Sequence, residues 1–340
     1  MESRIVIKKK QDSKKIKLRH RKSLSFGEDF IDKMKRRYIK QKKRITSIFK
    51  YLVILCIAYV ILSPVVIIIS NSFFTPKDVY SPVVSLIPEE GTLQNYILSF
   101  KRLDYVKTMF FTLIYVVSIT VIQVLICSIT GYGFARFNFP FKKIMFGCVI
   151  LTFVIPVHTI MIPLYMTFRS VDFFGLVSVI TGSPANLLGT KAPMYIMTFL
   201  GVGLRSGLYV YIFNQFFRGL PKEIEEAAFV DGAGMIYTYF KIMLVNAVPA
   251  IITCTVFSLV WQYNDSFYPG LFSMDSKYIL SMKLSTLRTT IEYIEKIMDS
   301  AISQTYVYAG VCMALIPIII IYLILQKYFI EGVERSGIVG

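Results

Sequence analysis

Residues 221–234 read PKEIEEAAFVDGAG, a short acidic stretch of mostly small residues between two long apolar segments. Pro221 suits the first turn of a helix, where its missing N–H costs no hydrogen bond. The glutamates that follow suit the same turn, because the positive end of a helix favours acidic side chains. Gly232 can end that helix in the left-handed conformation. The stretch therefore predicts a helix, a turn and a second helix that begins near Ala233.

The small residues of this elbow, as we call residues 221–234, leave its surface flat. Ala227 and Ala228 present almost no side chain, so another backbone can approach the helix closely. Such a surface suits docking into the groove of a partner protein. An ordinary connector between two membrane helices has the same pattern, and the residues alone leave both interpretations open.

The segments on both sides of the elbow belong to a membrane protein. The 340 residues are 55% hydrophobic and 17% charged, whereas a soluble domain is about 25% charged. A helix needs about 20 apolar residues to cross a bilayer. We therefore predict an all-α membrane protein with six spanning helices. Five lie in charge-free intervals, and the sixth contains Arg205; the intervals are 51–76, 108–135, 144–168, 192–217, 242–264 and 300–326.

The region before the fourth span is harder to interpret. Residues 173–190 lack charge but gather Gly, Ser, Pro and Asn, a composition typical of loops. We interpret them as an outer loop or a re-entrant segment, with a seventh span as the alternative. The span at 192–217 holds several glycines, and we expect it to break at residues 201–207.

The amino-terminal residues carry most of the positive charge. Residues 1–50 hold 19 Lys or Arg against 5 Asp or Glu, in a chain whose net charge is +17. Basic residues beside a membrane span stay on the cytoplasmic side and are attracted to anionic lipid. We expect no nucleic acid as partner, because the tail shows no nucleic-acid-binding motif. The predicted organisation is a basic cytoplasmic tail at 1–50, a six-helix domain at 51–330 and a cytoplasmic tail at 331–340.

No catalytic or metal site is predicted. The chain has no P-loop, HExxH or GxSxG motif. Its five cysteines lie in apolar runs without a CxxC pair, so we expect neither a metal nor a disulfide. His158 lies inside a predicted span. It is a candidate for proton relay or substrate binding, or for a hydrogen bond between packed helices.

The elbow resembles the EAA loop of ABC importer permeases, in which Glu-Ala-Ala is followed by Gly and then by Ile and Leu-Pro. Val245 stands where that pattern has its proline, and Pro249 matches a second proline common in the sugar-importing branch. We therefore expect the next span to start straighter than in the family. The residues that match are Glu226, Ala227, Ala228, Asp231, Gly232, Ile242 and Leu244.

Four other stretches resemble the carbohydrate (maltose-type) branch of the same family, and together they cover most of the chain. They are SITGYGFARFNFPFKK (128–143), IPVHTIMIPLYMTFRSVDFFG (155–175), WQYNDSFYPGLF (261–272) and QKYFIEGVERSGIVG (326–340). The resemblance implies the type I importer permease architecture in the cell membrane, with both termini in the cytoplasm.

The resemblance also implies the partners. A second homologous permease would complete a heterodimer, two ATPase subunits would dock on it, and an extracellular binding protein would deliver a sugar or oligosaccharide. Transport would follow alternating access, in which ATP shifts the populations of two states. ATP would bind only to the partner ATPase, so we expect no cofactor on this chain. Residues 326–340 form a second candidate contact with the ATPase, beside a coupling helix formed by Glu226, Ala227, Ala228, Asp231 and Gly232.

Candidate substrate contacts are Arg205, Trp261, Tyr263 and Asn264. Aromatic and amide side chains suit sugar rings, but Trp and Tyr also gather at membrane interfaces. A charge such as Arg205 inside a span usually has a function. Two other functions stay open: import of glycerol phosphate or another small polar solute, and a membrane-anchored scaffold or receptor that uses the basic tail.

Overall fold

The computed structural model describes residues 38, 40–172, 175–275 and 279–337. Regular secondary structure in these ranges is helical, apart from an isolated antiparallel bridge between Val171 and Ala185. The predicted all-α class is therefore confirmed. The chain divides into two compact units, residues 1–67 and 68–340.

The first unit contains most of a helix that runs from Lys40 to Asn71 and has the length and hydropathy of a membrane span. Its first turns are residues 40–50, which the sequence assigns to the basic tail. The described end of the tail is thus a continuation of the first span. Residues 1–37 and 39 of the predicted tail lie outside the described residues.

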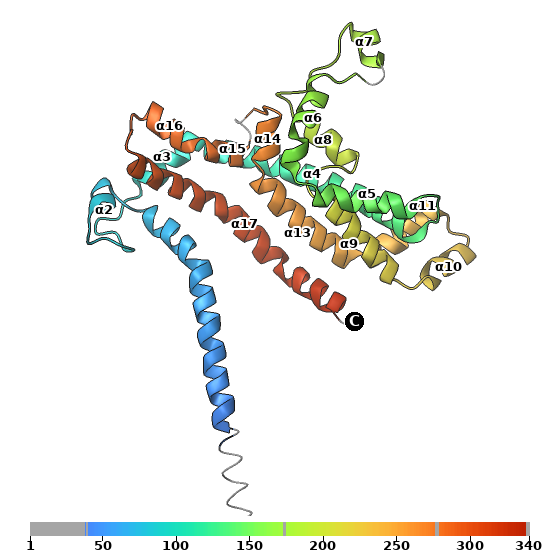
Figure 1. Ribbon diagram of the computed structural model, residues 1–340, viewed down its shortest axis with the longest axis horizontal. Helices are drawn as coiled ribbons and strands as arrows, with labels where there is room; N and C mark the ends of the chain where they lie inside the picture. The colour runs from blue at the N-terminus through green and yellow to red at the C-terminus, as the bar shows by residue number, and fades with distance from the viewer. Residues whose placement is uncertain (1–37, 39, 173–174, 276–278, 338–340) are drawn as a thin grey trace, which may run out of the picture. The chain divides into compact units, whose positions relative to one another are not determined.

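In the second unit, two unbroken helices are long and apolar enough to span. They are α4, Tyr105–Arg136, and α17, Ser300–Gly337. Helix α17 reaches Gly337, so residues 331–337 of the predicted carboxy-terminal tail are helical and continuous with the last span. Figure 1 shows α4, α9, α13 and α17 running between two ends of this unit, with α10 and α11 at one end and α3 and α16 at the other.

The other spans are broken. Helix α5, Lys142–Val154, meets α6, Val157–Arg169, at an angle of 101°. Ile155 before Pro156 has an extended backbone, as expected for a residue whose helical conformation the proline ring disfavours. The span predicted at 192–217 is α8, Ala192–Phe199, followed by α9, Ser206–Gly219. It breaks at residues 200–205, close to the predicted position.

The next span begins with a bend, so the absence of a proline at Val245 does not make its start straight; whether the start is straighter than in the family stays a prediction. The segment of α11 (Met235–Thr238), the π-helix η2 (Tyr239–Met243) and α12 (Leu244–Asn246) meets α13 (Val248–Asn264) at 76°. Pro249 explains the bend, because it has no N–H to donate to the carbonyl of Val245 and its ring crowds that carbonyl. Pro249 is therefore sufficient to bend the helix, although Val245 stands where the family pattern has another proline.

The remaining helices are short, and α7 projects beyond α6, away from the other helices (Figure 1). Helix α7 is only six residues long, too short for the seventh span that the sequence left open. Their bounds are α2 Pro76–Tyr80, α3 Gln94–Leu103, α7 Leu176–Thr181, α10 Glu223–Val230, α14 Phe267–Leu271, α15 Leu280–Ser285 and α16 Leu287–Ile294.

The core forms two apolar clusters that share α4. One joins the first half of α4, including Tyr115 and Ile119, to α14–α17. The other joins its second half, including Cys127 and Tyr132, to α9 and α13. Helix α4 is thus the central element against which the broken spans pack.

Gly131 sets the spacing between α4 and α9. A Cβ at this position would lie 2.5 Å from Cβ of Phe213 and 3.0 Å from the backbone of Val210 and Asn214. We therefore expect Gly131→Ala to force the helices apart and to destabilise the protein by about 1–3 kcal/mol.

Thermal unfolding of the purified protein in detergent measures this loss of stability. The control is Gly147→Ala in α5, where a Cβ meets nothing within 4 Å; equal melting temperatures for the two variants would contradict the prediction.

Candidate functional site

The elbow begins later than the sequence predicts. Helix α10 starts at Glu223, with Lys222 at its N-cap, so Pro221 precedes the helix and does not open it. The first turn holds Glu223, Glu225 and Glu226, where acidic side chains interact favourably with the helix dipole.

Gly232 ends α10 in the left-handed conformation, with φ of +81°. Its N–H donates to the carbonyl of Phe229, and the N–H of Ala233 donates to the carbonyl of Ala228 over 2.9 Å. These bonds satisfy carbonyls at the end of the helix. The chain then reverses into α11, so the predicted order of helix, turn and helix is present.

One face of the elbow is open and the other is packed. Glu226, Ala227, Asp231 and Gly232 are exposed, whereas Ala228 is buried. Four of the five residues predicted to dock on a partner are therefore accessible on this chain. The fifth is buried, and its carbonyl accepts from the N–H of Ala233 in the turn.

Glu225 is buried as well, and sequence reasoning missed it. Its Oε2 lies 2.8 Å from Nε of Arg136, with the two side chains 9% and 7% exposed. The hydroxyl of Tyr132 donates to Oε1 over 2.6 Å. Nη2 of Arg136 also donates to the carbonyl of Leu220 over 2.9 Å. We call Tyr132, Arg136 and Glu225 the elbow clamp, because they fasten α10 to the end of α4.

Aromatic rings surround the clamp. The ring of Tyr132 lies 5.4 Å from that of Phe217 in α9 and 5.1 Å from that of Tyr239 in η2. The hydroxyl of Tyr239 is 2.6 Å from Oγ of Ser128. Rings packed in this way exclude water, which strengthens the attraction between the buried charges.

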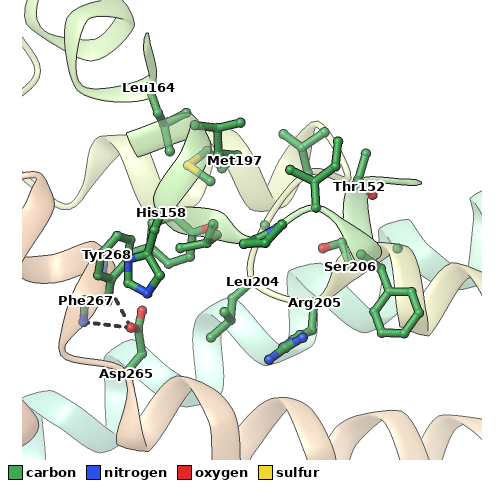
Figure 2. A pocket seen from close by; sticks show the side chains of 18 of the residues that line it. Thr152, His158, Leu164, Met197, Leu204, Arg205, Ser206, Asp265, Phe267 and Tyr268 are labelled. Carbon is green, nitrogen blue, oxygen red and sulfur yellow. Dashed lines mark hydrogen bonds between the residues drawn. The ribbon is translucent and has the colours of Figure 1, made fainter. Parts of the chain in front are cut away.

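A cavity of about 630 Å³ opens where three breaks in the helices meet. Its wall is formed by the bend between α5 and α6, by the break between α8 and α9, and by the turn between α13 and α14 (Figure 2). Most of the lining is apolar, and the charged or titratable side chains on it are His158, Arg205, Asp265 and Tyr268.

Arg205 lies at the break that precedes α9. Its backbone has φ of +60°, an uncommon conformation for a residue with a side chain. The guanidinium lies 5.2 Å from the centre of the Trp261 ring of α13, within the range of a cation–π contact. The sequence predicted Arg205 and Trp261 separately as substrate contacts, and the structure brings them together.

Asp265 follows α13 directly and caps α14. Its Oδ1 accepts from the N–H groups of Phe267, over 2.9 Å, and Tyr268, over 3.3 Å. Its Oδ2 has no hydrogen-bond partner among the described residues. Burial raises the pKa of this carboxyl to about 6. In Figure 2 the ring of His158 and the carboxyl of Asp265 point toward one another.

Gly207 holds the wall of the cavity together. A Cβ there would lie 2.7 Å from Oγ1 of Thr152 and from the carbonyl of Val149. Helix α5 therefore approaches the backbone of α9 at this point so closely that α9 has no room for a side chain.

Comparison with known proteins identifies the family. The model of the "Binding-protein-dependent transport system inner membrane component" family matches residues 123–335, which is more than half of the chain. The chain belongs to this family. It is a permease subunit of an ABC importer, as the resemblance of the elbow predicted, and not a membrane-anchored scaffold or receptor.

Individual relatives match most of the permease. The multiple sugar-binding transport system permease protein MsmG of Streptococcus mutans is 27% identical over 307 residues, 88% of this chain and 100% of the relative. The melibiose/raffinose/stachyose import permease protein MelC of Bacillus subtilis is 28% identical over 256 residues, 75% of this chain and 84% of the relative. A solved bacterial ABC transporter involved in the import of the acidic polysaccharide alginate has a chain with a TM-score of 0.64 and 22% identity. The match covers 84% of the permease and 97% of that chain, and it confirms the fold.

Family membership also implies partners. An inner-membrane component of a binding-protein-dependent system works with a separate ATPase and a substrate-binding protein. The permease is therefore a transporter subunit and not itself an enzyme, as the sequence predicted.

The other predicted substrate residues, Trp261 included, are not among the residues that line the cavity. The hydroxyl of Tyr263 donates to the carbonyl of Ala314 over 2.8 Å, and the side chain is buried against α4 and α17. Asn264 is exposed, and its Nδ2 donates to the carbonyl of Val260 in its own helix. His158 does line the cavity. Asp265 was missed although it stands beside Asn264 in the stretch that resembles the family.

Proposed function

We propose that this permease imports a sugar or oligosaccharide by alternating access. It forms one half of a heterodimer with a second homologous permease, and an extracellular sugar-binding protein delivers the substrate. The observation that carries the proposal is the cavity at the three breaks. An apolar pocket with a few convergent polar groups is the usual form of a small-molecule site.

The chemistry of the cavity suits a ligand with many hydroxyl groups. The free Oδ2 of Asp265 can accept a hydrogen bond from a hydroxyl, and Arg205 can donate to its oxygen. The apolar lining suits the carbon skeleton of a sugar ring. The two relatives described above are both named for sugar transport, which supports the same substrate class.

The elbow is proposed as the coupling helix. Glu226, Ala227, Asp231 and Gly232 contact the ATPase, and the buried Glu225 fastens α10 to α4. Two ATPase subunits bind and hydrolyse ATP, so this chain needs no cofactor of its own. Their closure on ATP favours one of the two access states, because it gives the states different free energies.

Both termini are proposed to lie in the cytoplasm, in the same compartment as the ATPase. The contact between Arg136 and the elbow puts the loop at 136–143 on the elbow's side of the membrane. That loop contains Lys142 and Lys143 as well as Arg136 and holds no acidic residue, which fits the cytoplasmic excess of basic residues.

A small phosphorylated solute such as glycerol phosphate is the second candidate. Arg205 favours it, because a guanidinium binds phosphate with two parallel hydrogen bonds. Asp265 disfavours it, because a carboxylate on the same cavity repels a second anion.

Uptake by the complete transporter tests both candidates. The permease is reconstituted in vesicles with its partner permease, the ATPase and the binding protein, and labelled sugars and glycerol phosphate are offered in turn. We expect ATP-dependent uptake of a sugar and none of glycerol phosphate. Arg205→Gln is expected to lower that uptake at least tenfold, since it removes the charged donor proposed to bind the substrate and a hydrogen bond to a charged group is worth about 1.5–3 kcal/mol.

The matched control is Arg169→Gln, at the exposed end of α6, which should transport at the normal rate. Absence of uptake for every sugar would refute the proposed substrate class. Equal rates for the two arginine variants would remove Arg205 from the substrate path.

A further inference from the structure

Two groups of polar contacts connect the elbow to the cavity through α4. The first is the elbow clamp at the end of α4. Arg136 binds both α10, through Glu225, and the linker from α9, through the carbonyl of Leu220. One buried guanidinium therefore holds both the elbow and the segment that leads into it.

The second group lies 13 residues earlier on α4, about 20 Å away at 1.5 Å per residue. Nε2 of Gln123 donates to the carbonyl of Leu204 over 2.6 Å and to Oγ of Ser206 over 2.9 Å. These residues are the two neighbours of Arg205. We call Gln123, Leu204 and Ser206 the break clamp, because they hold the break from which Arg205 enters the cavity.

The break clamp is itself fixed by α13. Oε1 of Gln123 accepts a hydrogen bond from Oγ of Ser258 over 2.7 Å, and Ser258 is 3.0 Å from Oγ1 of Thr120. Gln123 and Ser258 are both fully buried. The amide of Gln123 therefore has a single orientation, with its NH₂ group directed at the break.

Between the two clamps, α4 and α9 form one stiff unit. Helix α4 is unbroken from Tyr105 to Arg136, and it packs on α9 so closely that Gly131 has no room for a methyl group. The alternative route from the elbow, through α11, η2 and α12 to α13, contains a π-helix and a bend of 76°. The chain that links α9 to α10 passes through Leu220, whose backbone is extended and whose carbonyl accepts a hydrogen bond from Arg136.

We propose that Glu225, Arg136 and Tyr132 are positioning residues that join the elbow to the α4–α9 unit, so that displacement of the elbow moves Arg205 through the break clamp. The inference rests on the proposed role of the elbow as coupling helix. Glu225 touches neither the cavity nor, since its side chain is buried, the exposed docking face. Its effect is on the transfer of motion and not on binding of substrate or ATPase.

The test uses the complete transporter in vesicles. Glu225→Gln removes the charge and keeps the shape, and Tyr132→Phe removes only the hydroxyl that binds Glu225. For both variants we expect the ATPase to co-purify as usual and to hydrolyse ATP within twofold of the normal rate. Sugar taken up per ATP hydrolysed should fall at least fivefold. Glu223→Gln, an exposed acid of the same helix turn, is the matched control and should keep the normal ratio.

A second measurement reports on the cavity itself. Val202→Cys places a thiol on the cavity wall at the α8–α9 break, in a chain whose exposed Cys56 and Cys148 are replaced by serine. We expect ATP to change the rate at which a water-soluble maleimide labels this thiol. Addition of Glu225→Gln should abolish that change, and a purely structural role of Glu225 would leave it in place.

If Glu225→Gln does not fold, the double variant Arg136→Glu with Glu225→Arg is used in its place, because it keeps one positive and one negative charge in the clamp. We expect this double variant to take up more sugar per ATP hydrolysed than either of its single variants. An unchanged ratio in Glu225→Gln or Tyr132→Phe would overturn the inference while sugar uptake stands. Loss of the bound ATPase in these variants would also overturn it, because the clamp would then act in docking. If the unaltered transporter takes up no sugar, the proposed substrate is wrong, and the labelling of Val202→Cys still decides the role of the clamp.

Discussion

Gly232→Val is expected to lower sugar uptake at least tenfold and to leave the membrane helices folded. At φ of +81°, a residue with a Cβ costs about 1–2 kcal/mol, and a β-branched residue fits this region worst. The end of α10 would therefore rearrange, and with it the face that carries Ala227 and Asp231. Since no atom lies within 4 Å of the new Cβ, the loss arises from backbone conformation and not from a clash.

Gly234→Ala is the matched control for this variant. Gly234 lies in the same turn, and a Cβ there also meets nothing within 4 Å, but its φ of −74° suits any residue. ATP hydrolysis and sugar uptake by the reconstituted transporter are measured together. The predicted result is hydrolysis without matching uptake for Gly232→Val and normal coupling for Gly234→Ala. Normal coupling in both variants would show that the left-handed turn has no role in transport.

Arg136→Ala is expected to destabilise the permease by about 3–5 kcal/mol, because it leaves the carboxylate of Glu225 buried without its counter-ion. Most of this cost comes from the stranded charge. The double variant Arg136→Ala with Glu225→Ala should therefore be more stable than Arg136→Ala alone. Denaturation of the purified permease in detergent, followed by circular dichroism, measures all three free energies.

The comparison for this prediction is a pair of the same residue types at the surface. Nε of Arg288 lies 2.9 Å from Oε1 of Glu292 within one helix, and the side chain of Arg288 is 44% exposed. Loss of such a pair costs about 0.3–0.5 kcal/mol, so Arg288→Ala should unfold almost as the unaltered protein does. A small effect of Arg136→Ala, similar to that of Arg288→Ala, would mean that water reaches Glu225.

The sequence was sufficient to place the apolar helices and the elbow. Of the six predicted spans, three are, within the described residues, unbroken helices long and apolar enough to cross a membrane and two are bent pairs of helices, whereas the sixth is the broken pair α8 and α9. Charge-free intervals mark the membrane helices because the bilayer excludes charge, and Gly232 marks the turn because glycine adopts positive φ without strain. The bend before α13 follows from Pro249 and not from position 245, where this chain has valine in place of the proline of the family pattern. Pro249 was sufficient to interrupt the backbone hydrogen bonds.

The candidate site was predicted less well, for two physical reasons. Residues two positions apart on a helix point in nearly opposite directions, so Trp261 and Tyr263 could not both face one cavity. The spacing alone excluded that pair. Glu225 was overlooked because an acid in the first turn of a helix usually faces water. Its burial depends on Arg136, which is 89 positions away in the sequence and becomes a neighbour only after folding.

The close contact at Gly207 limits how related permeases can change the size of the cavity, and with it the size of the substrate. Any larger residue there would separate α5 from α9, the two helices whose ends form adjoining parts of the wall. The wall can therefore not be widened or narrowed at this point without loss of the fold. Apolar side chains elsewhere in the lining, such as Leu164 and Met197, can be exchanged for others of similar volume at less than about 1.5 kcal/mol. Divergence toward longer or shorter saccharides is thus confined to the replaceable lining, while the frame stays constant.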